Sequence, residues 1–273
     1  MEDQLTYQLY EDLNSQQLLL PSLPDVAIRV GQAVQHELAD AGRVAHVIEN
    51  DPAITAKLIR VANSARYGGT QPIATLPEAI ARIGLETTHR LVVSFALREL
   101  FRCHAPSLAR RMQQCWGRAR QVAAVCHVLA QRCSGLNPEI ALLVGLVHNL
   151  GEVALLAYAR DFPELIEDAV RLDGLLRRLG PRLTTTILSR WEFQYTLVAA
   201  TEALTQADTE TASEYGDLLL IAVSRLDSPA TDTPRVTAAC ERLQLPDCSP
   251  GALAGLLEEA RREVLDLLEL LGD

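Results

Sequence analysis

Helix-start signals recur along the whole chain and constrain its fold more than any other feature. In each, a side chain that can cap a helix stands shortly before a proline of the first turn. The capping oxygen can accept a backbone N–H that has no partner inside the helix, and proline supplies a helical φ where its missing donor costs nothing. The occurrences lie at 22–25, 51–52, 75–78, 137–138, 161–164 and 249–250. Because no alternating apolar run is flanked by hairpin turns, the sequence predicts an all-α fold.

Between these starts, apolar residues recur with the 3.6-residue period of a helix. The chain is 48% hydrophobic but only 4% aromatic, and Leu, Ala, Val and Ile predominate, which favours helices packed on helices. At two starts, Thr75 with Glu78 and Asp161 with Glu164, we also expect the reciprocal hydrogen bonds of a capping box. The helices predicted in this way span about 52–62, 76–83, 86–102, 107–133, 140–158 and 212–226, with another ending near 206.

Charge is distributed unevenly over a chain whose net charge is −10. Residues 98–132 contain seven arginines and one acid, whereas 207–273 contain fourteen acids and five arginines. One interpretation is that both are solvated helix faces; the other is that the two faces meet each other or a charged partner. The overall acidity argues against a nucleic-acid partner, since phosphate binding needs a positive field. As a candidate surface for docking a partner protein we select Arg98, Arg102, Arg110, Arg111 and Arg120.

Two features bear on location and assembly. The N-terminus opens with acidic residues rather than a signal peptide, and the longest apolar run, Ile140–Val147, is too short to cross a bilayer, so we expect a cytoplasmic protein without a membrane partner. A leucine-rich stripe runs through 253–271. It either packs on its own domain or forms a homodimer through residues 250–273.

The predicted helix 140–158 is apolar apart from a few positions, and His148 and Asn149 stand side by side in its middle. A metal-dependent hydrolase needs several His and Asp ligands around its ion. Asn149 offers no carboxylate, and no histidine follows His148 in the chain. The sequence also lacks a nucleophile elbow, a Walker loop and a G-x-G-x-x-G loop. We therefore expect no metal, no cofactor and no catalytic residues.

Several motifs resemble one known family when they are taken in order. They are LPSLPDVAIRV at 20–30, VIENDPAITAKLIRVANSARYG at 47–68, PIATLPEAIARIGLETTHRLVVSFALRELF at 72–101, CWGRARQVAAVC at 115–126, ALLVGLVHNLGEVALL at 141–156 and LSRWEF at 188–193. Together they are similar to the HDOD family, the HD-related output domains of bacterial signalling proteins. The resemblance implies an all-α fold related to the metal-dependent HD phosphohydrolases, usually without their metal site.

The resemblance also divides the chain and locates a site. It predicts an HDOD domain over 18–205, made of two helical subdomains (about 18–104 and 105–205) that share a core. An N-terminal helix at 1–17 precedes it, and an acidic helical extension at 206–273 follows it. The first histidine of the HD pattern falls near Arg118, and its His-Asp pair falls on His148 and Asn149. Because Arg118 places a cation where a cation should bind, the resemblance implies a vestigial site. The sequence departs from the family pattern after Trp191, where Gln194 and Glu202 follow.

On this basis we expect a non-catalytic regulatory or output module of bacterial signal transduction. Such a module binds a signalling protein or a small ligand, and Arg118 could hold a small anion bidentately. Alternatively, Arg118 pairs with an acid of its own chain. The competing hypothesis for the whole protein is a divergent HD-type phosphohydrolase that acts on nucleotides or cyclic dinucleotides.

Overall fold

The computed structural model describes residues 20–64, 67–69, 71–102, 105–205, 213–227, 233–245 and 249–271. All regular elements in these ranges are helical, so the predicted all-α class is confirmed. The N-terminal helix predicted at 1–17 lies outside the described residues. Buried apolar side chains from the N-terminal lobe, the central helices and the C-terminal part join in a single core.

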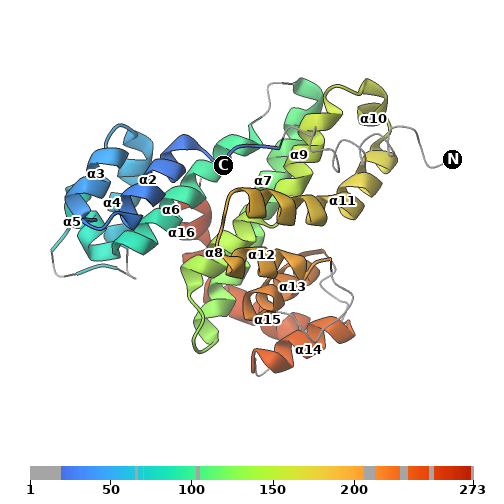
Figure 1. The fold of residues 1–273 in the computed structure, drawn as a ribbon. Coiled ribbons are helices and arrows are strands. Elements are labelled where there is room, and N and C mark those ends of the chain that lie inside the picture. Colours follow the sequence, from blue (N-terminus) through green and yellow to red (C-terminus); the bar gives the residue numbers. More distant parts are fainter. Residues whose placement is uncertain are drawn as a thin grey trace.

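The first helices form a lobe of their own at the left of Figure 1. They are α2 (Asp25–Gln35), α3 (Ala41–Ile48), α4 (Pro52–Ala62), α5 (Leu76–Ile83) and α6 (Leu85–Leu97), followed by the 3-10 helix η1 (Arg98–Phe101). Gly84 joins α5 to α6 with φ of +90°, a conformation that glycine adopts without strain. Asn63, the residue after α4, closes the loop that leads from α4 to α5. Its side chain donates to the carbonyl of Ile73 and accepts from the N–H of Ile73.

The central helices connect this lobe to the rest of the molecule. They are α7 (Pro106–Arg132), α8 (Pro138–Val147), α9 (Leu150–Ala159), α10 (Pro163–Glu167), α11 (Ala169–Arg190) and α12 (Tyr195–Glu202). The long helix α7 packs along α8, and α11 packs along α9. Gly145 permits the first of these contacts, since a Cβ at this position would lie only 2.3 Å from Cα of Ala123. The mid-part of the chain is thus an antiparallel set of helices in close backbone contact.

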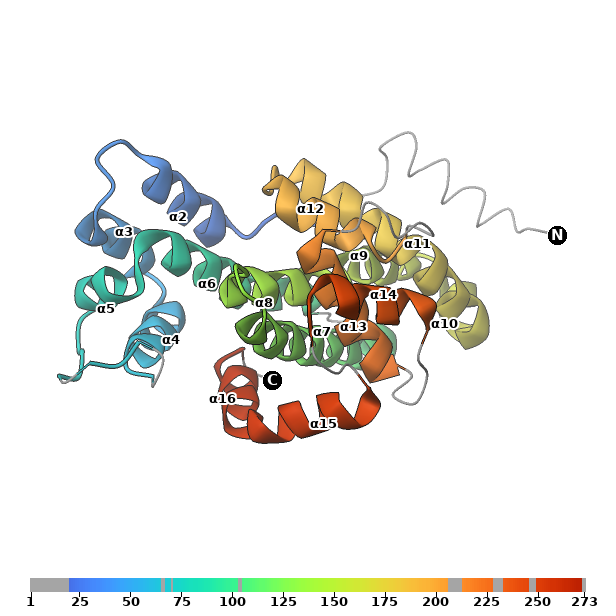
Figure 2. The ribbon, with the colours of Figure 1, turned by 90° about the horizontal axis from the view of Figure 1, so that it is seen from below.

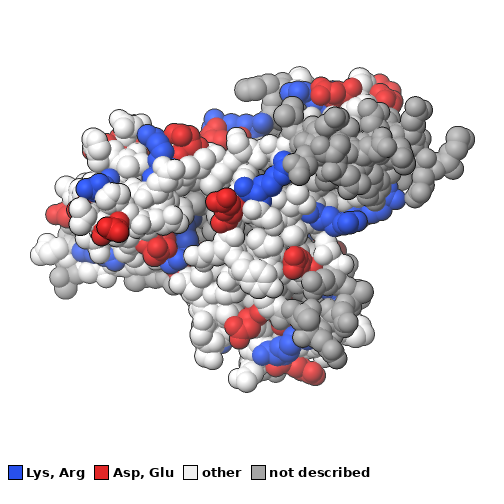
Figure 3. Space-filling model, viewed as in Figure 1, with Lys and Arg blue, Asp and Glu red and all other residues white. Residues whose placement is uncertain are grey.

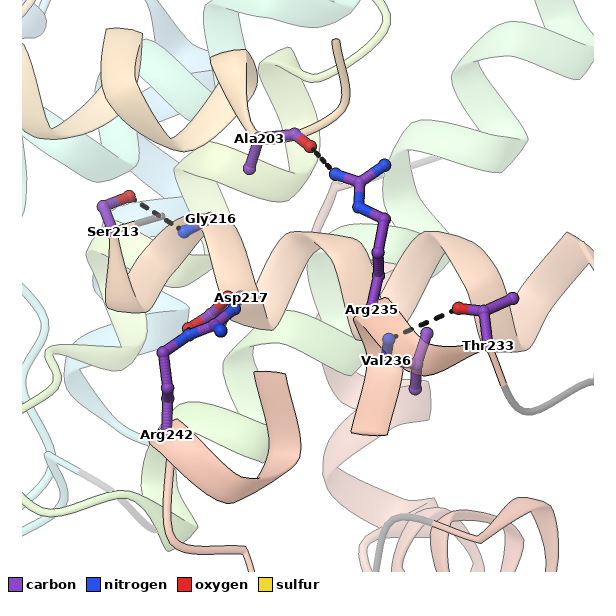
Figure 4. A network of polar contacts seen from close by, with 8 residues as sticks. All are labelled: Ala203, Ser213, Gly216, Asp217, Thr233, Arg235, Val236 and Arg242. Carbon is purple, nitrogen blue, oxygen red and sulfur yellow. Dashed lines mark hydrogen bonds and ion pairs between the residues drawn. The ribbon is translucent and has the colours of Figure 1, made fainter. Parts of the chain in front are cut away.

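The remaining helices are α13 (Glu214–Asp227), α14 (Pro234–Arg242), α15 (Pro250–Glu259) and α16 (Arg261–Leu271). In Figure 1 the first three lie below the central helices, whereas α16 lies higher, near the first lobe. Asp217 is 1% exposed, and it accepts two hydrogen bonds from the guanidinium of Arg242, at 2.8 and 2.5 Å (Figure 4). Nearby, Arg235 donates to the carbonyl of Ala203 at 2.5 Å. These contacts fix α14 on α13 and attach the pair to the end of α12.

Three predicted helix caps are confirmed in detail. Asp51, Asn137 and Ser249 each accept a backbone N–H from the first turn of the helix that follows. In all three cases proline occupies the first helical turn. Local sequence alone therefore determines where α4, α8 and α15 begin.

Three other predicted caps make no side-chain cap hydrogen bond, although Thr75 does occupy the N-cap position of α5. Ser22 makes no cap, because α2 begins too far downstream of it. The hydroxyl of Thr75 donates to the carboxylate of Glu78 at 2.7 Å instead of accepting a backbone N–H, so this capping box does not form. The side chain of Asp161 accepts from Arg160 at 3.3 Å, and α10 begins without a side-chain cap.

The helix predicted over 140–158 is interrupted, which corrects the expectation of one continuous element. Helix α8 ends at Val147 and α9 begins at Leu150. Taken together, Pro138–Ala159 is long and apolar enough by composition to cross a membrane, with a mean hydropathy of 1.9 over its most apolar stretch. However, 83% of that stretch is buried inside the protein, as in a core helix. The C-terminal stripe is likewise divided, into α15 and α16, with Ala260 between them.

Candidate functional site

The break between α8 and α9 centres on a threonine from α11. The hydroxyl of Thr184 accepts from the N–H of Gly151 at 2.9 Å, and its one hydrogen faces the carbonyls of His148 and Gly180, each 3.1 Å away. In an uninterrupted helix the carbonyl of His148 and the N–H of Gly151 would pair with backbone four residues away. A side chain that enters the backbone ladder in this way is a recognised cause of a helix kink. Gly151 is required there, because a Cβ would lie within 2.0 Å of the backbone of α11, at 1.9 Å from the carbonyl oxygen of Gly180.

His148 is the first residue of the break, and its ring is buried and hydrogen-bonded inside the protein. Its Nδ1 lies 2.6 Å from the carbonyl oxygen of Gly145. Because that oxygen can only accept, Nδ1 must carry the proton of the neutral ring. Burial, and to a smaller degree the positive charge of Arg118, lowers the pKa of His148 to about 4, against a partial increase from the Gly145 hydrogen bond. The imidazole is therefore neutral at physiological pH.

Asn149 uses its amide for a contact that a carboxylate could not make. It is 2% exposed, and its Nδ2 donates to the carbonyl of Cys115 on α7 at 2.9 Å. An aspartate here would bring a carboxylate oxygen against that carbonyl, since both groups only accept. The amide oxygen Oδ1 is buried and makes no hydrogen bond within the described part of the chain. Asn149 thus connects the break to α7.

Arg118 is paired within the chain, as one of the two sequence hypotheses predicted. Its guanidinium lies 2.6 Å from the carboxylate of Asp227 and donates to the carbonyl of Val223 at 3.1 Å. Both partners belong to α13, so Arg118 fastens α13 to α7. The side chain of Asp227 is 61% exposed, which leaves the outer side of this ion pair in contact with solvent.

The fold relationship implied by the sequence raises the question of whether these residues suit a divalent metal. The described residues contain no group of three or more His, Cys, Asp or Glu side chains that could hold one. At the HD position itself, Nδ1 of His148 is used by a carbonyl, the amide nitrogen of Asn149 is used by another, and Arg118 contributes a positive charge. The donor set therefore does not fit a metal ion, and we derive no chemistry from one.

The match to a family model decides what kind of protein this is. The model of the HDOD domain matches residues 20–207, more than half of the chain. This chain belongs to the HDOD family. The region matched contains α2 to α12 and all three residues of the predicted vestigial site, Arg118, His148 and Asn149.

Solved structures with a similar fold have been described under different functional names. A protein of Shewanella amazonensis SB2B, provisionally named a metal-dependent phosphohydrolase, is 28% identical, with a TM-score of 0.74 and 88% of each chain covered. An HDOD domain protein of Geobacter sulfurreducens is 19% identical, with a TM-score of 0.60, 92% of this chain and 93% of the other covered. The latter similarity shows the fold alone.

A curated relative is an uncharacterised protein of Treponema pallidum (strain Nichols). It is 26% identical over 172 residues, which is 62% of this chain and 32% of the relative. The match thus spans about a third of the length of that protein.

Sequence reasoning missed Glu152, which lies beside the predicted vestigial site. It lies on the first turn of α9 and accepts a hydrogen bond from Sγ of Cys115 at 3.5 Å. Burial raises the pKa of Glu152, and Asp227 and Asp173 add to the increase, while the Cys115 contact and the charge of Arg118 oppose it. A signal was available, because Glu152 is the one acid between positions 140 and 158 of an otherwise apolar stretch.

The five arginines of the proposed docking surface do not share one environment in the HDOD fold. Arg111 lies on α7, one turn before Cys115 and two turns before Arg118. It pairs with Asp173 of α11 at 2.5 Å. Arg120 instead donates to the carbonyl of Leu268 on α16 at 3.0 Å. The other three are Arg98 in η1, Arg102, which pairs with Glu99 at 2.8 Å, and the exposed Arg110. Arg111 therefore belongs with the vestigial site, and Arg120 with the C-terminal helices.

The two oppositely charged regions of the sequence meet each other. Contacts from α7 to the acidic C-terminal part include Arg118 with Asp227 and Arg132 with Glu259. On the surface visible in Figure 3, basic and acidic residues of the described chain lie interspersed. The sequence hypothesis that the faces are complementary is the one that these contacts support.

Proposed function

We propose that this HDOD chain is a non-catalytic regulatory module of cytoplasmic signal transduction, which acts by binding a partner protein. The observation that carries the proposal is the state of the residue pair at the HD position. The side chain of His148 donates to the carbonyl of Gly145, and that of Asn149 donates to the carbonyl of Cys115. Both side chains are buried. This pair stabilises a helix junction, a role that needs neither a metal nor a substrate.

One protein of similar fold carries a signalling name. A protein of Marinobacter aquaeolei VT8, provisionally named a signal transduction protein, shares the fold with a TM-score of 0.65 at 19% identity, over 94% of this chain and 61% of the other. For this chain, a small anionic ligand at Arg118 is the weaker form of the binding hypothesis, because Asp227 already occupies that guanidinium. A protein surface is the stronger form.

The second candidate function is a divergent HD-type phosphohydrolase acting on nucleotides or cyclic dinucleotides. One observation favours it, namely the 28% identity to the Shewanella protein that carries a phosphohydrolase name. Burial raises the pKa of Glu152, and this is the side chain that such an enzyme would use as its general acid or base at this site.

Metal content and turnover of the purified protein separate the two functions. We expect far less than one equivalent of transition metal per chain, and no hydrolysis of nucleotides or cyclic dinucleotides with added Mn²⁺ or Mg²⁺. Stoichiometric metal, with turnover that is lost in His148→Gln but kept in His46→Gln, would establish the enzyme instead. His46 is a matched control because its side chain is 82% exposed and lies far along the chain from the site.

A further inference from the structure

The two C-terminal helices lie as a strap along one side of α7. Figure 2 shows α15 and α16 together at the lower side of α7, away from α11 and α12. Helix α16 packs on α7, and its far end reaches the N-terminal lobe, where Glu269 pairs with Arg60 of α4 at 3.1 Å. The strap, residues 250–271, therefore touches both the central helices and the first lobe.

Several polar contacts hold the strap on α7. On α7, Arg120 and Gln131 lie on one stripe with His127, at spacings of seven and four residues. Gln131 donates to Glu263 at 2.6 Å, and Nδ1 of His127 lies 3.4 Å from the same carboxylate. Arg132 adds an exposed contact to Glu259 at 3.3 Å.

Few apolar side chains of the strap are fully buried. Among its described side chains only Leu270 and Leu271 of α16 are buried, while Leu257 and Leu267 pack against the core with part of their surface exposed. By contrast, His127 beneath the strap is 3% exposed, and Ala124 on the same stripe is 1% exposed. The α7 side chains on this stripe are thus buried, whereas most side chains of the strap keep part of their surface exposed. A segment with few buried contacts opens at a lower free-energy cost than the core beneath it.

The charges of the two surfaces are complementary. Residues 250–271 contain five acids and two arginines, and the receiving face presents Arg60, Arg120 and Arg132. Because the face accommodates an acidic amphipathic helix of its own chain, it has the shape and charge for an acidic amphipathic helix from elsewhere.

From these contacts we infer that the strap is a self-docked, displaceable segment, and that the α7 face beneath it binds an acidic amphipathic helix of a partner protein. The strap and the partner helix compete for the same arginines, so the chain binds its partner when the strap is released. This inference rests on the proposed function, since it supplies the surface and the partner chemistry of a binding module.

A labelled peptide of residues 250–271 tests the inference on the full chain. The variant Glu259→Lys/Glu263→Lys/Glu269→Lys weakens the strap without shortening the protein. We expect fluorescence anisotropy to show saturable binding of the wild-type peptide to this variant, at least 10-fold tighter than to the wild-type chain. Adding Arg120→Glu and Arg132→Glu should abolish the binding, and raising the salt concentration should weaken it.

A matched control is Glu37→Lys/Glu164→Lys/Glu167→Lys, which changes the net charge equally at exposed acids outside the strap. It should bind the peptide no better than the wild-type chain does. Equal binding by the wild-type chain, the control and the strap variant, all folded by circular dichroism, would overturn the inference. So would failure of the strap variant to fold, because the strap would then be an integral part of the core.

Hydrogen exchange on the unmodified chain gives an independent answer. Amides of α15 and α16 should exchange at least 10-fold faster than those of α7 around 119–130. Protection equal to that of α7 would contradict a displaceable strap. A dimer in light scattering that the strap variant abolishes would show that the strap docks on a second copy, and would overturn docking within one chain. These outcomes leave the metal and turnover measurements untouched, so the proposed function can stand or fail separately.

Discussion

At the scale of single residues, the chemistry of the site follows from which groups can donate and which can only accept. Asn149 donates to a carbonyl that a carboxylate would repel, and His148 donates from Nδ1 to another. The sequence singles out both residues by their place in an apolar stretch, and Arg118 only through the family resemblance. It could not supply their partners, because the carbonyls of Cys115 and Gly145 carry no sequence information.

The buried imidazole makes stability depend on pH. The pKa of His148 falls from an ordinary value of 6.5 to about 4 in the folded chain, so the unfolded state binds the proton first as the pH drops. Its contribution is fully present above pH 6.5 and is lost toward pH 4, by roughly 3 kcal/mol. Urea unfolding of the wild-type chain and of His148→Gln measures the free energy of unfolding of each. The advantage of the wild-type chain over the variant should be smaller at pH 4 than at pH 7 by about this amount. A difference that does not change with pH would contradict a buried neutral histidine.

At the scale of helices, the sequence predicted most elements but not the junction between α8 and α9. The apolar period continues through 140–158 without a proline, and Asn149, which occupies the N-cap position of α9, makes no side-chain cap there. The cause lies in Thr184, about 35 residues further on, whose hydroxyl replaces the missing backbone contacts. Confirmed caps such as Asp51 depend only on neighbouring residues, whereas this break depends on tertiary packing.

Replacing the threonine tests that explanation. Thr184→Val keeps the shape of the side chain but leaves the carbonyl of His148 and the N–H of Gly151 without their partner. We expect a loss of about 2–3 kcal/mol in the free energy of unfolding. Thr186→Val, on the exposed side of α11, should change it by less than about 0.5 kcal/mol. If the two substitutions lower the free energy of unfolding equally, the hydroxyl of Thr184 does not stabilise the break between α8 and α9.

A pair of glycines tests the close packing of helices. In Gly145→Ala the new methyl would overlap the backbone of α7 at Ala123, at 2.3 Å from its Cα. The cost should be about 3 kcal/mol or more. Gly174→Ala, in α11, meets nothing within 4 Å and should stabilise the protein by roughly 0.5–1 kcal/mol through helix propensity. Thermal melts of both variants measure the contrast, and a tolerated Gly145→Ala would rule out the close α7–α8 contact.

At the scale of the whole molecule, the uneven charge noted in the sequence proves to be an internal complementarity. Arginines of α7 pair with the acidic C-terminal part through contacts such as Arg118 with Asp227. Charge counts could suggest that the regions meet, but they could not say which arginines do so. Arg111 and Arg120 were grouped by sequence proximity, although they project toward different helices.

Attachment of α14 depends on one buried carboxylate. In Arg242→Ala the carboxylate of Asp217, 1% exposed, would lose both of its hydrogen bonds from the guanidinium. We expect a loss of about 2–4 kcal/mol in the free energy of unfolding. Arg132→Ala removes an exposed ion pair with Glu259 and should cost less than about 1 kcal/mol. Urea unfolding measures both losses in the free energy of unfolding. Similar losses would mean that the buried ion pair of Asp217 stabilises the protein no more than the exposed pair does.

The residues at the HD position form a structural joint, and we expect them to hold no metal. Anomalous scattering from crystals soaked in Mn²⁺ is the decisive measurement. We expect no anomalous peak within coordination distance of His148, Asn149 or Glu152. A strong peak there, with His148 Nε2 and carboxylate oxygens about 2.2 Å from the ion, would contradict it.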